Sequence, residues 1–172
     1  MHDDEPGNVR EDAFHVTAAV HMTAILAEGF RADRRGVLGT GAYFDLGSET
    51  TGLAPARRYY LDQPLIVFRC AVALGRVLDL DDEETRAQFR RFQRYLIQHL
   101  GREVVLRLGH GGHVDLSFEA LATVREMYDT VQRTFATDGQ QRIAVRDTRR
   151  VQVLTVHDVQ RGELLWTRPN PG

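Results

Sequence analysis

The chain has 172 residues, of which 42% are apolar, and its formal net charge at pH 7 is -2. This length fits one domain, or one domain with an insertion, and the apolar fraction is typical of a protein with a hydrophobic core rather than of a disordered chain. The nearly balanced charge gives no support to a generally basic surface for nucleic acid or anionic membranes.

Residues 1–12 are predicted to form a flexible leader, because they are mostly polar and contain Pro6 and Gly7. They lack the apolar centre of a signal peptide, and no stretch of the chain is long and apolar enough to span a bilayer. These features predict a cytoplasmic protein without membrane contact. Secretion by a signal-independent route stays an open alternative.

The segment from residue 13 to residue 80 is expected to contain three strands, one helix and two loops. Apolar side chains at helical spacing predict a helix over residues 18–30, and Gly29 fits its C-terminal end. Residues 36–41 predict a glycine-rich turn. Strands are expected at residues 13–17, 42–44 and 65–74. The last strand is a continuous apolar run, typical of a strand buried on both faces, and its Cys70 is expected to be a buried small hydrophobe.

The second half is expected to begin with a helical pair, inserted at about residues 81–137. Acidic residues from Asp81 open the first helix, where they favour the positive end of the helix dipole, and Gly101 ends it. Ser117 is expected to cap the second helix, which continues to Phe135. Further strands are expected at residues 103–108, 143–145 and 151–159.

Residues 161–172, which include Trp166 and two prolines, are expected to be a loosely ordered tail. The folded domain is therefore predicted to span residues 13–160. Its mixture of about six short strands with separate helices predicts an α+β protein.

Three short motifs occur in chain order, each where a strand or a turn is expected. The first is His15-Val16-Thr17, followed by Ile25-Leu26 and Gly29-Phe30. The second is Gly39-Thr40-Gly41-Ala42-Tyr43-Phe44. The third is Ala56-Arg57-Arg58-Tyr59-Tyr60, followed by an apolar run that ends in Ala73-Leu74-Gly75. In this order they resemble the catalytic domain of the poly(ADP-ribose) polymerases, in the His-Tyr group of the ADP-ribosyltransferase superfamily.

This resemblance implies an ADP-ribosyltransferase-like fold, with split mixed or antiparallel sheets, flanking helices and the inserted helical pair. It also implies an enzyme that cleaves the bond between nicotinamide and ribose in NAD and transfers ADP-ribose to a protein or nucleic-acid acceptor. The transition state of that cleavage has oxocarbenium character. Such an enzyme acts by positioning NAD and stabilising charge rather than by supplying a strong nucleophile.

Roles for individual residues follow from the resemblance. His15 would hydrogen-bond the adenosine ribose, while the Thr17 hydroxyl and the Val16 backbone would bond the nicotinamide carboxamide. Tyr43 would line the pocket. Tyr59 would stack on the nicotinamide ring, and Tyr60 is the alternative in another register. The residues assigned to NAD are thus His15, Val16, Thr17, Gly39, Tyr43, Tyr59, Tyr60 and Arg142, and those assigned to catalysis are His15, Tyr43 and Gln141.

The glutamate that the family usually carries at the start of a late strand is missing. The matching stretch is Gln140-Gln141-Arg142-Ile143, and alternative registers place Arg142 or Gln141 at the glutamate position. We expect Gln141 to face the pocket and Arg142 to face away or to bind the NAD phosphates. The remaining acids, Glu119, Glu126 and Glu163, lie outside this strand, and a contact of one of them with the pocket stays an open alternative.

The missing carboxylate predicts transfer of a single ADP-ribose, because a glutamine can neither take up a proton from the acceptor nor offset a full positive charge. Two other readings stay open: a non-catalytic module that binds NAD or ADP-ribose, and an RNA 2'-phosphotransferase on the same fold. No metal site is expected, because His110 and His113 lack cysteine partners.

Overall fold

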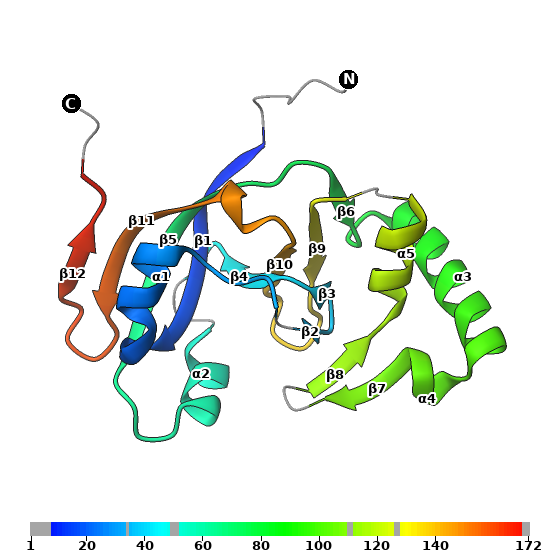
Figure 1. The fold of residues 1–172 in the computed structure, drawn as a ribbon, viewed down its shortest axis with the longest axis horizontal. Helices are drawn as coiled ribbons and strands as arrows, with labels where there is room; N and C mark the ends of the chain where they lie inside the picture. Colours follow the sequence, from blue (N-terminus) through cyan, green and yellow to red (C-terminus); the bar gives the residue numbers. More distant parts are fainter. Residues whose placement is uncertain (1–7, 34, 49–51, 110–111, 126–127, 170–172) are drawn as a thin grey trace. The chain divides into compact units, whose positions relative to one another are not determined.

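The computed structural model describes residues 8–33, 35–48, 52–109, 112–125 and 128–169 (Figure 1). Within these residues the protein is α+β, with an eight-stranded mixed sheet and two sheets of two strands. The strands of the large sheet, in spatial order, are β12 (Leu164–Thr167), β11 (Val151–Asp158), β5 (Leu65–Ala73), β1 (Val9–Ala18), β4 (Ala42–Leu46), β10 (Gln141–Val145), β9 (Thr130–Thr134) and β6 (Val77–Asp79).

The small sheets and the helices complete the secondary structure of the described residues. The small sheets pair β2 (Arg35–Gly36) with β3 (Gly39–Thr40) and β7 (Leu106–Gly109) with β8 (Gly112–Asp115). The α-helices are α1 (Met22–Glu28), α2 (Leu53–Tyr59), α3 (Glu83–Leu100), α4 (Arg102–Val105) and α5 (Ser117–Arg125). The 3-10 turns are η1 (Ala19–His21) and η2 (Thr148–Arg150). None of the described helices is long and apolar enough to cross a membrane.

The chain divides into two compact units, each of which draws on separate parts of the sequence. The first unit consists of Met1–Phe30, Phe44–Ala73 and Arg149–Gly172, and the second of Arg31–Tyr43 and Leu74–Thr148.

In the first unit, β1 pairs antiparallel with β5 on one side and with β4 on the other. β5 also pairs antiparallel with β11, and β11 with β12 (Figure 1). The side chains of β5 from Leu65 to Val72 are buried except for Arg69, as expected of a strand covered on both faces. Cys70 is fully buried, which confirms the prediction made from its apolar surroundings.

In the second unit, β9 pairs antiparallel with β10 and parallel with β6. Helices α3 and α5 lie side by side (Figure 1), and the rings of Phe89 and Phe118 stack between them with centroids 4.4 Å apart. Helix α3 begins where its acidic residues predicted, because the Asp82 side chain accepts a hydrogen bond from Thr85 N at 2.7 Å. The apolar core of this unit includes Leu38, Leu80, Phe89, Phe118, Leu121, Tyr128, Val131 and Ala144.

The expected helix from Ser117 to Phe135 is wrong in its second half, since α5 ends at Arg125 and residues 130–134 form β9. The apolar spacing of this stretch fits a helix, but β9 pairs with β10 along its whole length and with β6 at Thr130, Val131 and Gln132. Tertiary pairing of this kind overrides a local pattern. The expected cap is also wrong: Ser117 N donates to Asp115 Oδ1 at 2.9 Å, and the buried Ser117 Oγ has no partner among the described residues.

The expected strand at residues 103–108 is a helical turn followed by a strand. Its first part is α4, in which Val105 N donates to Gly101 O at 3.2 Å, and only Leu106–Gly109 pairs as β7. Val105 is buried. A short apolar run fits a helix as well as a strand. The burial of Val105 results from tertiary packing, which the spacing of apolar residues in the sequence does not reveal.

The chain ends also differ from the expectation. β1 begins at Val9 rather than at Ala13, and Trp166 lies in β12, opposite Val156 of β11, rather than in a loose tail. The large sheet therefore has more strands than the six expected. Helix α2 was not anticipated, because its sequence has a proline near its start and little apolar periodicity.

Candidate functional site

Strand β1 places His15 and Thr17 on one face and Val16 on the other, because side chains alternate along a strand. The His15 ring lies 5.1 Å from the Phe30 ring and 5.7 Å from the Phe44 ring, measured between centroids. These aromatic contacts hold the half-buried imidazole in one orientation.

Thr17 and Tyr60 meet although they are far apart in sequence. Thr17 Oγ1 donates a hydrogen bond to Tyr60 Oη at 3.1 Å, across a separation of 43 residues. Thr17 is only 2% exposed, so this contact is made in a largely water-free setting, where a hydrogen bond is hard to replace. The first and third motifs are thereby joined within the first unit.

The two neighbouring tyrosines of the third motif have different environments. Tyr59 is 68% exposed, and its ring packs edge-on against the Tyr60 ring at 4.9 Å. Tyr60 follows α2 directly, and its ring also lies 5.9 Å from that of His21. Tyr60 is therefore held in place, whereas Tyr59 presents most of its ring to solvent.

Close approach of α2 to the strands depends on Gly52. A Cβ atom at Gly52 would lie 2.8 Å from Asp45 Oδ2 and 3.0 Å from Val16 Cγ2. A side chain there would push the helix away from β1 and β4. Gly52 thus helps to set the position of Tyr60 at the other end of the helix.

In the second unit, Tyr43 closes the β2–β3 hairpin rather than pointing freely outward. Its hydroxyl donates to Gly39 O at 2.5 Å and accepts from Leu38 N at 3.1 Å. Gly39 has a φ of +83°, and a Cβ there would lie 2.6 Å from the Phe118 Cβ. Only glycine satisfies both the backbone angle and the space.

Glu119 of α5 also holds this hairpin. Its Oε1 accepts from Thr40 N at 2.6 Å, and its Oε2 lies 3.5 Å from Arg146 Nη2. Of the other two acids noted in the sequence, Glu126 lies outside the described residues and Glu163 is exposed in the β11–β12 turn. Glu119 was missed as a contact of the second motif, because no local pattern links residues so far apart.

The start of β10 holds Gln141 and Arg142, the two candidates for the glutamate position. Gln141 Nε2 donates to Asp81 Oδ2 at 3.1 Å. Desolvation of Asp81 is outweighed by hydrogen bonds from Thr134 and Gln141, which hold the pKa of this carboxyl below its usual value. Arg142 forms an ion pair with Asp138.

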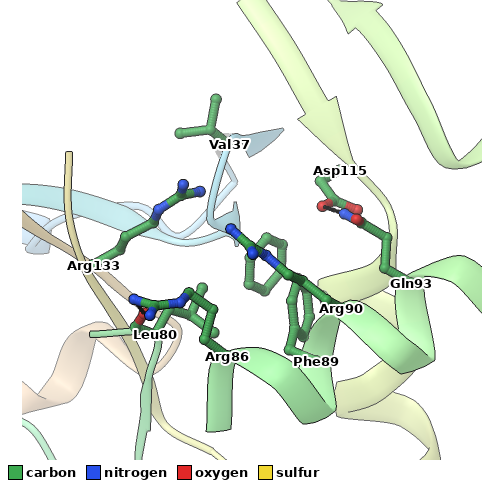
Figure 2. Close-up of a pocket in the computed structure, with 9 residues that line it drawn as sticks. Val37, Leu80, Arg86, Phe89, Arg90, Gln93, Asp115 and Arg133 are labelled. Atoms are coloured by element: carbon green, nitrogen blue, oxygen red, sulfur yellow. Dashed lines mark hydrogen bonds between the residues drawn. The ribbon is translucent and has the colours of Figure 1, made fainter. Parts of the chain in front are cut away.

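A pocket in the second unit contains none of the residues that the sequence suggested. It lies between α3, β9 and the hairpin, and three arginine side chains reach it (Figure 2). They are Arg86, Arg90 and Arg133. The sequence does carry a signal for two of them, since Arg86 and Arg90 are one helical turn apart on α3.

Comparison with known proteins gives no match, neither to a protein family nor to a curated protein. Among the described residues no group of three or more His, Cys, Asp or Glu side chains could hold a metal ion. His110 lies outside these residues.

Proposed function

We propose that this chain has the ADP-ribosyltransferase-like fold and acts as an NAD-dependent mono-ADP-ribosyltransferase. The observation that carries the proposal is the 3.1 Å hydrogen bond between Thr17 Oγ1 and Tyr60 Oη. The resemblance assigns Thr17 to the nicotinamide carboxamide and a tyrosine of the third motif to the nicotinamide ring. The side chains of Thr17 and Tyr60 are assigned to NAD independently of each other. Their contact in space supports a common binding site for its nicotinamide.

The hydrogen-bonding capacity of Thr17 fits the role. Its hydroxyl has one proton, which it donates to Tyr60, and two lone pairs that can accept. A carboxamide N–H₂ group is a donor, so it would find an acceptor at Thr17 without breaking the bond to Tyr60. The same contact favours Tyr60 over Tyr59 as the tyrosine beside the nicotinamide.

His15 supports the proposal through its position. It shares a face of β1 with Thr17, and rings on two sides fix its imidazole. A preorganised donor or acceptor costs little to order when a ribose hydroxyl binds. The proposal therefore gives His15 the adenosine ribose, at a distance from the nicotinamide contact of Thr17.

In the proposed reaction the bond between the nicotinamide nitrogen and ribose C1' breaks, and nicotinamide leaves as a neutral base with the bonding electrons. An oxygen or nitrogen atom of the acceptor forms the new bond to C1' and releases its proton to solvent. The residues of the first unit position NAD for this step, which is the main contribution expected for an oxocarbenium-like transition state.

The test is calorimetry with NAD and with a non-hydrolysable NAD analogue, followed by an assay of nicotinamide release. Tyr60→Ala should weaken binding about fivefold or more, because ring stacking contributes on the order of 1 kcal/mol beyond area burial. Tyr60→Phe keeps the ring and should retain most of the affinity, while Thr17→Val should lower it. Tyr59→Ala should have a smaller effect than Tyr60→Ala.

Leu100→Ala is the control, since Leu100 is an exposed apolar residue at the end of α3 in the second unit. It should leave NAD affinity unchanged. No heat of binding with wild type, or equal losses for Tyr60→Ala and Leu100→Ala, would contradict the proposal.

A second candidate function is a module that binds NAD or ADP-ribose without transferring it. The observation that favours it is that both candidates for the glutamate position lack a carboxylate and are each bonded to an aspartate, Gln141 to Asp81 and Arg142 to Asp138. This module would bind the analogue and release no nicotinamide from NAD. Calorimetry and the release assay together separate the two functions.

A further inference from the structure

The pocket of the second unit is small and has an apolar floor. Its volume is about 80 Å³, well below the roughly 300 to 1,000 Å³ of pockets that hold whole small molecules. Leu80, Phe89 and Phe118 form the floor, and each of them is less than a tenth exposed. This space suits a single compact group rather than a nucleotide.

Three guanidinium groups surround this floor. Arg86 and Arg90 project from successive turns of α3, and Arg133 projects from β9 (Figure 2). Arg86 Nη1 donates to Leu80 O at 3.4 Å, and Arg133 lies over the Phe135 ring at 5.2 Å. Among the described residues none of the three forms an ion pair with a carboxylate. Like charges held around one space favour an anion there.

One acid, Asp115, also lines the pocket. Asp115 accepts hydrogen bonds from Gln93 Nε2 at 2.5 Å and from Ser117 N at 2.9 Å. Figure 2 shows Asp115 and Gln93 together, on the side of the pocket away from Arg133. Asp115 therefore places one negative charge on that side of the pocket, and the three arginines outnumber it.

The positive charge continues along α3 beyond the pocket. A second hollow on the same helix is lined by Arg86, Arg90, Arg91 and Arg94, with Glu83 at its start. Arg86, Arg90 and Arg94 recur every four residues, so they form one row about 12 Å long at ~1.5 Å per residue. Each nucleotide of a nucleic-acid strand carries one negatively charged phosphate, so such a row can meet more than one phosphate.

An exposed aromatic side chain accompanies the row. Tyr95 is 57% exposed, lies one turn after Arg91 on α3, and its ring packs at 4.1 Å from that of His99. Basic side chains together with an exposed aromatic ring are the combination that binds single strands, because phosphates meet the charges and a base stacks on the ring. A free phosphate ion would make no use of Tyr95.

We propose that α3 and Arg133 form a binding site for single-stranded nucleic acid, in which Arg86, Arg90 and Arg133 hold one phosphate group in the pocket. Arg91, Arg94 and Tyr95 contact the neighbouring nucleotides. All 22 basic side chains of the chain are arginines, and the planar guanidinium group binds phosphate oxygens in pairs, which a lysine cannot do. This inference goes beyond the proposed transferase function and does not depend on it.

The experiment measures fluorescence anisotropy of a fluorescein-labelled oligonucleotide of 12 thymidines with the full chain at about 50 mM salt, where screening is weak. Wild type should bind, with an affinity that falls as salt rises. Arg90→Gln and Arg133→Gln should each weaken binding about fivefold and reduce the slope of log affinity against log salt by about 0.7. Tyr95→Ala should weaken binding without changing that slope.

Arg161→Gln is the matched control, since Arg161 is an exposed arginine in the first unit, and it should leave binding unchanged. Because Arg86 is partly buried, Arg86→Lys keeps its charge while Arg86→Gln removes it, and only the second should reduce the salt slope. Competition by inorganic phosphate forms a separate arm. Failure of wild type to bind, equal losses in Arg161→Gln and Arg90→Gln, or binding of phosphate alone would overturn the proposal.

Discussion

At the scale of single residues, His15 and His21 differ in the surroundings of their imidazole rings. The His15 ring lies near the rings of Phe30 and Phe44, whereas His21 is exposed and its ring is tilted against that of Tyr60 at 5.9 Å between centroids. The two histidines thus differ in exposure and in the number of aromatic neighbours, and the proposal assigns the ligand contact to His15, which has two.

Replacement of His15 tests its proposed contact with the adenosine ribose. His15→Phe keeps an aromatic ring between Phe30 and Phe44 but removes the hydrogen-bonding nitrogens. It should weaken NAD binding by roughly 1 to 3 kcal/mol, the cost of a lost hydrogen bond in a buried site, as measured by calorimetry. His21→Phe is the control, and similar losses for both variants would show that the first motif has been misread.

Cys70 illustrates how burial controls a reactive group. The thiol is fully buried in β5, and desolvation raises its pKa to about 12 from an ordinary value of 9.0. Iodoacetamide reacts with the thiolate, so native protein at pH 9 should stay unlabelled in a mass measurement, while protein in denaturant should gain one label. Gln98→Cys, at an exposed position of α3, should be labelled natively. Rapid native labelling of Cys70 would contradict its burial.

At the scale of elements, the identity of residues 130–134 as a strand depends on its neighbours. β9 is flanked by β10 and β6, and Thr130 Oγ1 donates to Leu74 O at 2.7 Å in a fully buried position. A helix through this stretch would lose both ladders. Removal of the Thr130 hydroxyl therefore tests whether residues 130–134 form the strand β9.

Thr130→Val replaces this hydroxyl by a methyl group of the same shape. It should lower the free energy of unfolding by roughly 1 to 3 kcal/mol, because the Leu74 carbonyl loses its buried donor. Denaturant titration measures the change. Thr167→Val, at an exposed position of β12, should change stability by less than about 0.5 kcal/mol. Equal small effects would argue against the position of β9.

At the scale of the whole molecule, the missing glutamate decides what kind of enzyme the proposed function allows. Wild type should transfer no more than one ADP-ribose to each acceptor site, because Gln141 cannot deprotonate the next hydroxyl. Gln141→Glu should raise nicotinamide release if Gln141 holds the glutamate position. Polymer formation by wild type would overturn this expectation, and a gain confined to Arg142→Glu would move the register by one residue.

The contact between Gln141 and Asp81 affects the variant Gln141→Glu. Gln141 donates to Asp81, so Gln141→Glu would face a carboxylate with a second carboxylate, and the pKa of one of them would rise. Because the folded pKa of Asp81 in wild type is lowered, its contribution to stability is present at neutral pH and is lost as pH falls through that value. Combining Gln141→Glu with Asp81→Asn removes the repulsion and isolates the effect on turnover.

Much of the chain could be predicted from local sequence. The apolar run of β5 and the acidic start of α3 lie where their patterns indicated, and the α+β class follows from them. Long, regular patterns are reliable because burial on one or two faces demands them. Stretches such as residues 103–108 carry short apolar patterns that fit a helix and a strand equally well. Their secondary structure is determined by contacts with neighbouring elements.

The sequence by itself determined which residues belong to the three motifs and that β1 would present His15 and Thr17 on one face, since strand alternation is a local property. Only the tertiary structure decided that Tyr60 rather than Tyr59 reaches Thr17, that Tyr43 closes a hairpin, and that Arg133 lies beside Arg86 and Arg90. Tyr60 and Thr17, and likewise Arg133 and the two arginines of α3, are separated by sequence distances that obey no helical or strand period. Their proximity is set by strand pairing and by packing of the core, which act between distant parts of the chain.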